Sequence, residues 1–99
     1  MMISSGASVL VNKSRGKEYV QVVKYRFDGE KRKRLLLKAF GPNEMENILK
    51  AHLFADCYNT LYTMSLKMRG TAKWNDFKTV ATATYGYILG TETLKRVLK

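Results

Sequence analysis

Two glycine-containing turns divide the first forty residues into three runs rich in β-branched and aromatic side chains, and this pattern most constrains the fold. The turns lie at residues 14–17 and at the Asp28-Gly29 dipeptide. Asp-Gly between such runs is among the strongest short signals for a β-hairpin. The sequence therefore predicts a three-stranded antiparallel β-meander over residues 8–40.

Two-residue loops at both turns set a register that separates two faces of this meander. They pair Val11 with Val20 and Val22 with Leu35, and a four-residue loop at either turn would keep the same faces. One face then collects the apolar residues expected in the core, which are Val9, Val11, Val20, Val22, Leu35, Leu37 and Ala39. The opposite face is mixed, with Leu10, Asn12, Tyr19, Gln21, Val23, Tyr25, Arg32, Arg34, Leu36 and Lys38.

Positive charge is concentrated in the same segment. The chain has 18 Lys and Arg against 8 Asp and Glu, a formal net charge of +10, and residues 13–38 hold ten of the basic residues and three of the acidic ones. General solubility accounts for charge spread evenly along a chain, whereas charge gathered in one quarter of it is typical of proteins that bind a polyanion. Strand alternation places Arg32 and Arg34 on the mixed face. A charged hairpin tip on the core side would carry Lys24, Arg26, Lys31 and Lys33.

The second half of the chain has helical spacing of apolar residues. Pro42 with Glu44 and Glu46 favours a helix start, and Gly70 favours its end, so a long helix is expected over residues 42–69. Its apolar surface is wider than one stripe and needs cover from more than one side. Either the segment 71–99, expected to form one or two C-terminal helices, covers it, or a second subunit does. The homodimer alternative predicts an interface of Phe54, Tyr58, Leu61 and Tyr62.

These expectations define an α+β fold in which a three-stranded antiparallel β-meander packs on a long α-helix and C-terminal helices follow. The length of 99 residues predicts a single domain over 1–99, with a disordered N-terminus at residues 1–7.

The sequence carries little of the chemistry that enzymes need. One histidine, His52, and one cysteine, Cys57, make neither a closed zinc site nor a disulfide. No phosphate loop is present, and no metal or other cofactor is expected. We therefore expect a non-enzymatic protein, with a metal-free ribonuclease built from Lys, Arg and Tyr as the remaining catalytic alternative. No apolar run is long enough to span a membrane, and the first ten residues do not resemble a signal peptide, so the predicted location is cytoplasmic.

The segment NKSRGKEYVQVVKYRFDGEKRKRLLLKAFGPNEMENILKAH, residues 12–52, resembles the small N-terminal DNA-binding module of tyrosine recombinases. It also resembles the N-terminal hairpin segment of some insertion-sequence transposases. The shared pattern is a Gly-Lys turn, an aromatic-starting strand, a second Gly turn, a basic strand ending in Phe, and a helix. In such modules the sheet enters the major groove, which implies groove-facing roles for Tyr19, Gln21, Val23, Tyr25, Arg32 and Arg34.

The resemblance covers about two fifths of the chain and carries no catalytic domain after His52, so it implies no recombinase or transposase activity. The chain as a whole is similar to short, basic, tyrosine-rich proteins of crenarchaeal filamentous and rod-shaped viruses. That similarity would make it a viral protein of the host cytoplasm.

The function expected from these features is nucleic-acid binding, with duplex DNA favoured over RNA. RNA stays open because Tyr19 and Tyr25 could stack on unpaired bases, although plain cross-strand packing explains both rings equally well. Homodimeric assembly through the long helix is the alternative from another class. The predicted nucleic-acid-binding residues are Tyr19, Gln21, Lys24, Tyr25, Arg26, Lys31, Arg32, Lys33, Arg34 and Lys38.

Overall fold

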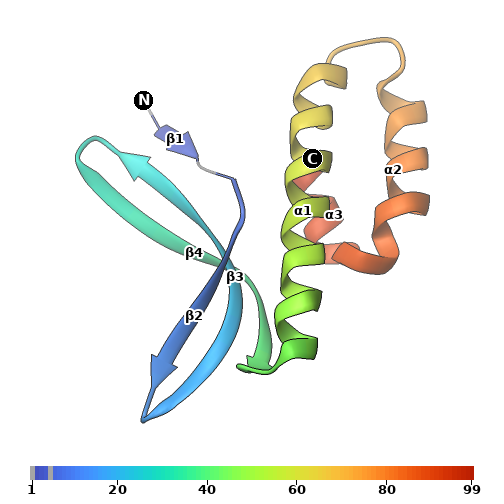
Figure 1. The fold of residues 1–99 in the computed structure, drawn as a ribbon. Helices are drawn as coiled ribbons and strands as arrows, with labels where there is room; N and C mark the ends of the chain where they lie inside the picture. The colour runs from blue at the N-terminus through green and yellow to red at the C-terminus, as the bar shows by residue number, and fades with distance from the viewer. Residues whose placement is uncertain (1, 5) are drawn as a thin grey trace. The chain divides into compact units, whose positions relative to one another are not determined.

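Strands precede helices along the chain, as the predicted α+β class requires. Figure 1 shows a computed structural model, which describes residues 2–4 and 6–99. The predicted class of a β-meander followed by helices is confirmed, and the long helix is three residues shorter at its start and one shorter at its end than expected. The elements are β1 (Met2–Ser4), β2 (Ser8–Ser14), β3 (Lys17–Asp28), β4 (Lys31–Pro42), α1 (Met45–Met68), α2 (Trp74–Leu89) and α3 (Thr91–Val97).

Strand β3 lies at the centre of the sheet. Strand β4 pairs along one of its edges, and β2 and β1 pair in succession along the other, all antiparallel (Figure 1). Strand β1 pairs with residues 26–28, where the structure differs from the disordered N-terminus expected over residues 1–7. A long β3 leaves backbone groups unpaired beyond the end of β2, and β1 supplies partners for them. Met1 and Ser5 lie outside the described residues.

The β2–β3 hairpin has the predicted register. Val11 pairs with Val20 and Val9 pairs with Val22. The loop consists of Arg15 (φ 53°) and Gly16 (φ 79°), and two central residues with positive φ are the signature of a type I′ turn.

The predicted β3–β4 register is wrong by two residues near the turn. The loop residues are Gly29 and Glu30 instead of Asp28 and Gly29, so Lys24 pairs with Leu35. Gly29 has a φ of 64° at the first central position, as in a type II′ turn. This turn type needs one residue with positive φ, whereas a type I′ turn needs two. A displacement by two residues preserves the faces, so the separation of the basic run into two faces holds at the hairpin tip.

Farther from the turn, two β-bulges shift the pairing of β4. Val23 pairs with Leu36 but Val22 pairs with Lys38, which leaves Leu37 as an extra residue on β4. A second shift between Val20 and Gln21 makes Phe40 extra in the same way. Because each bulge inserts one residue, the alternation of β4 relative to β3 reverses between them. The sequence around Leu37 and Phe40 contains no pattern that predicts a bulge.

The chain divides into two compact units, Met1–Asp56 and Cys57–Lys99, and α1 is continuous across the boundary. In the first unit Val20, Val22 and Val23 are buried, and Phe54 packs edge-on against Phe40 with ring centroids 5.8 Å apart. Val23 was expected on the mixed face. It lies at the first bulge, where extra twist turns successive residues inward. Of the expected core face, Val11 and Ala39 are exposed, and Val9, Leu35 and Leu37 are partly buried.

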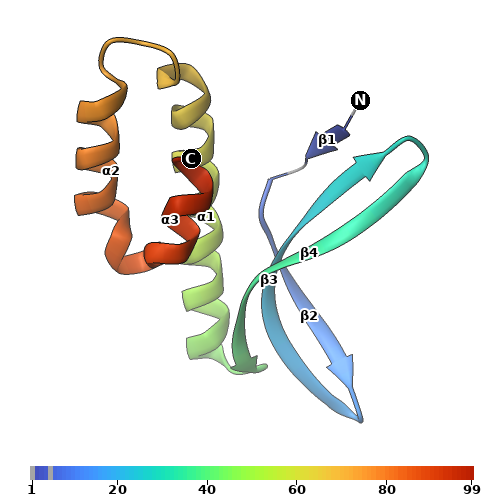
Figure 2. The same ribbon diagram turned by 180° about the vertical axis from the view of Figure 1, so that it is seen from behind.

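The second unit is helical, and Figure 2 shows it from behind. Its fully buried or nearly buried residues are Tyr58, Leu61, Ser65, Ala81, Leu89, Leu94 and Val97. The β-branched stretch in α2 is helical, and within it Thr79 and Thr82 donate their hydroxyls to the main-chain oxygens of Asn75 (3.2 Å) and Lys78 (2.8 Å), four residues earlier. A single domain over residues 1–99 stays a prediction.

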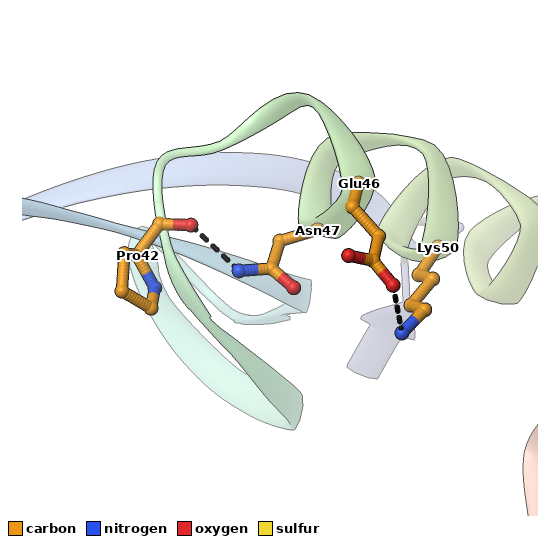
Figure 3. A network of polar contacts seen from close by, with 4 residues as sticks. All are labelled: Pro42, Glu46, Asn47 and Lys50. Atoms are coloured by element: carbon orange, nitrogen blue, oxygen red, sulfur yellow. Dashed lines mark hydrogen bonds and ion pairs between the residues drawn. The ribbon is translucent and has the colours of Figure 1, made fainter.

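A hydrogen bond from a side chain to the backbone spans the junction where β4 ends and α1 begins (Figure 3). Asn47 Nδ2 donates to the main-chain oxygen of Pro42 at 2.9 Å. Gly41, with φ 102°, passes so close that a Cβ there would lie 3.3 Å from Asn47 Nδ2. One turn further along α1, Lys50 Nζ lies 2.9 Å from Glu46 Oε1, and this contact lowers the pKa of Glu46, first through the hydrogen bond and then through charge.

Candidate nucleic-acid interface

One face of the β3–β4 hairpin tip combines aromatic rings with guanidinium groups. Tyr25 pairs with Arg34, and Phe27 pairs with Arg32, so these four residues share a face. The guanidinium carbon of Arg32 lies 4.5 Å from the centroid of the Tyr25 ring, a cation–π contact. This contact restrains a long side chain before any ligand binds, which lowers the entropy that binding would cost.

The other face of the tip is a cluster of cations. Arg26 pairs directly with Lys33, and Lys31 pairs with Asp28. Like charges directly opposite one another destabilise a sheet, and neither Arg26 nor Lys33 is buried in a core that would offset this. Within the part of the chain that the structure describes, none of the residues Lys31, Arg32, Lys33 and Arg34 forms an ion pair with an acidic side chain. Asp28 and Glu30 offset part of this charge, and the tip keeps an excess of positive charge.

Tyr19 and Gln21 lie on the same face of β3 as Tyr25 but towards the other end of the strand, roughly 20 Å and 13 Å from it at the usual rise per residue. Both are partly buried. Tyr19 lines a cleft of about 420 Å³ together with Glu18 and Glu44. Carboxylates beside Tyr19 repel phosphates, so the tip is the part of this face better suited to a polyanion.

Lys38, one of the predicted binding residues, lies on the opposite face from Arg32 and Arg34. Its Nζ atom is 5.4 Å from the ring centroid of Phe40 and 5.7 Å from that of Phe54. The bulge at Leu37 causes this, because it pairs Lys38 with the buried Val22. The placement of Lys38 on the mixed face is therefore corrected.

Three of the four residues predicted for a dimer interface are buried within the single chain. The exposed fractions are 1% for Phe54, 7% for Tyr58 and 0% for Leu61, and Tyr62 is partly buried with its ring stacked at 6.2 Å on that of Tyr58. Side chains already removed from water offer no area to a second subunit. Their apolar character reflects the cores of this chain, and the predicted interface is corrected accordingly.

Phe27 is the residue of this surface that sequence reasoning missed. It is 36% exposed and lies on the face of Tyr25 and Arg32, at the very end of the hairpin. The sequence pattern that could have identified it is the alternation of aromatic residues near the end of β3, where Tyr25 is followed two residues later by Phe27.

The remaining chemistry-bearing residues do not assemble into a site. His52 is exposed and Cys57 is partly buried. Among the residues described, no three His, Cys, Asp or Glu side chains lie close enough to hold a metal ion.

Comparison with known proteins gives no matching family model, no similar curated protein and no similar solved structure. None of the helices in the described part of the chain has both the length and the apolar content needed to cross a bilayer. The cations and aromatic rings of the hairpin tip are therefore the features of the molecule that bear on its function.

Proposed function

We propose that the protein binds duplex DNA through the β3–β4 hairpin. The observation that carries this proposal is the exposed run Lys31–Arg34, in which Lys33 lies directly opposite Arg26 and no side chain forms an ion pair in the described part of the chain. Such a cluster costs folding stability through self-repulsion, and phosphates remove that cost when they bind. Released counterions would supply most of the affinity.

The two faces of the hairpin suit two kinds of contact. Strands of a β-sheet can enter the major groove of B-DNA, which is about 12 Å wide, and at the tip β1 extends the β3–β4 pair to three strands. The face with Arg32 and Arg34 would meet base edges, where arginine pairs bidentately with guanine. Arg26, Lys31 and Lys33 on the other face would neutralise phosphates, which position the protein without reading sequence.

The test is a salt titration of duplex binding by the wild type and by the double variant Arg26→Ala/Lys33→Ala. With roughly six phosphate contacts in the wild type, log K against log[salt] should fall with a slope near −5, and the variant should lose about 2 units of that slope. The matched control is Lys67→Ala/Lys73→Ala, which removes the same charge from exposed positions of the helical unit. A salt-independent wild type, or equal losses in the two double variants, would refute the proposal.

Single-stranded RNA is the second candidate, favoured by the exposed Phe27 next to Tyr25 at the tip. Aromatic rings stack on unpaired bases, which a duplex does not offer. Competition among duplex DNA, single-stranded DNA and single-stranded RNA distinguishes the two, with Phe27→Ala as the informative variant. Duplex binding should survive Phe27→Ala with little change, whereas stacking on unpaired bases should weaken by about tenfold.

A further inference from the structure

A groove in the helical unit separates α2 from α3. Its volume is about 480 Å³, within the usual range for small-molecule sites. All of its lining residues belong to the unit Cys57–Lys99, so it is distinct from the hairpin. They are Lys78, Thr82 and Gly86 on α2 and Thr91, Leu94, Lys95 and Leu98 on or just after α3.

The floor of the groove is apolar and closely packed. Leu94 and Leu98 line it from the α3 side, and Gly86 lines it from α2. A Cβ at Gly86 would lie 3.2 Å from Leu94 Cδ1, so the glycine lets the two helices approach. Thr82 donates its hydroxyl to the main-chain oxygen of Lys78, which leaves that proton committed to its own helix. The groove therefore favours a ligand with an apolar body.

The charge of the groove has one sign. Lys78 and Lys95 line it from different helices, and no acidic side chain is among its lining residues. Burying part of an anion between two ammonium groups is favourable where like-charged carboxylates are absent. The complementary ligand is thus apolar along its body and anionic at one end.

An aromatic base is a poor fit for this site. The residues that line the groove include no aromatic ring, and the ring of Trp74 beside it already contacts the cations of Arg69 at 5.1 Å and Lys78 at 5.8 Å and stacks on Phe77 at 5.6 Å. Bases bind single-stranded nucleic-acid sites chiefly by stacking on free aromatic faces. A flexible aliphatic chain needs no such face.

We propose that the α2–α3 groove binds a medium-chain fatty acid, with its carboxylate between Lys78 and Lys95 and its alkyl chain against Leu94 and Leu98. This site is separate from the hairpin surface and does not depend on the DNA-binding proposal.

Trp74, the single tryptophan, is a built-in reporter for the test. Its ring contacts the Lys78 ammonium, so a carboxylate that draws Lys78 away changes its fluorescence. Titration of the full chain with decanoate, checked by calorimetry, should give saturable binding with one site. Lys95→Ala should weaken it by about tenfold through loss of a charge-assisted contact, and Thr82→Leu should weaken it by filling the groove. The matched control is Arg96→Ala, which removes a charge from the next position of α3, outside the groove.

Three ligand controls test the chemistry. Decanol and decylamine share the chain but lack the anion, and both should bind at least about tenfold more weakly than decanoate. Phosphatidylglycerol vesicles test a membrane surface as the alternative occupant. Equal binding of decanol, an equal loss in Arg96→Ala and Lys95→Ala, or binding to vesicles without binding to decanoate would each overturn the proposal. Circular dichroism of each variant must match the wild type, and a Lys95→Arg variant should retain binding.

Discussion

Single residues set the two hairpin turns of the sheet by different means. In the β2–β3 turn both Arg15 and Gly16 adopt positive φ, whereas in the β3–β4 turn Gly29 alone does so. For an L-residue other than Gly, Asn or Asp, the left-handed region costs roughly 1–2 kcal/mol. Arg15 therefore carries a conformational cost that Gly29 avoids.

Replacing Arg15 with asparagine should stabilise the protein. Asparagine tolerates positive φ, so Arg15→Asn should raise the free energy of unfolding by about 0.5–1 kcal/mol, as measured by urea denaturation. Arg15→Gln is the matched control because it removes the same charge without easing the backbone. Equal stabilities of the two variants would show that charge, and not conformation, governs this position.

At the scale of elements, the sequence predicts those features of the strands that depend on residues close together in the chain. The β2–β3 register follows from a turn whose two residues are adjacent to alternating valines, and it was confirmed. The bulges at Leu37 and Phe40 were not foreseeable, because they satisfy packing against residues far away in the chain, such as Phe54. The predicted separation of residues 31–34 into two faces of the sheet holds because these residues lie between the turn and the first bulge. Lys38, beyond that bulge, was misplaced for the same reason.

The start of α1 should show a pH dependence that follows from Glu46. Its pKa is lowered in the folded protein by Lys50, so its stabilising contribution is complete above the ordinary glutamate pKa. It is lost as the pH falls through the lowered pKa of the folded state. Glu46→Gln should therefore be less stable than the wild type at neutral pH by a small amount, and the difference should vanish in acid.

Urea denaturation at a series of pH values measures this effect, with Glu44→Gln as the control. Glu44 lies at the same helix end, so it shares the interaction with the helix dipole but forms no ion pair with Lys50 in the described chain. A stability gap for Glu46→Gln that persists unchanged at low pH would contradict the role of the Lys50 contact.

For the whole molecule, the decisive feature is that one helix belongs to both units. The 24-residue α1 contributes Phe54 to the core of the first unit and Leu61 to that of the second. A helix is a cooperative structure, so loss of its first half frays the second. The two units should therefore unfold together.

The variant Phe54→Ala tests this coupling. Truncating a fully buried phenylalanine should cost about 3–5 kcal/mol, and the Trp74 fluorescence of the second unit should report the full loss. Leu53→Ala is the matched control, because Leu53 is the preceding residue of the same helix and is 51% exposed, so it should change stability little. If Phe54→Ala lowers the midpoint of the β-sheet signal in circular dichroism but leaves the Trp74 transition in place, the units fold independently. In that case the sheet would be a separable module joined to the helical unit by a helix that does not transmit its stability.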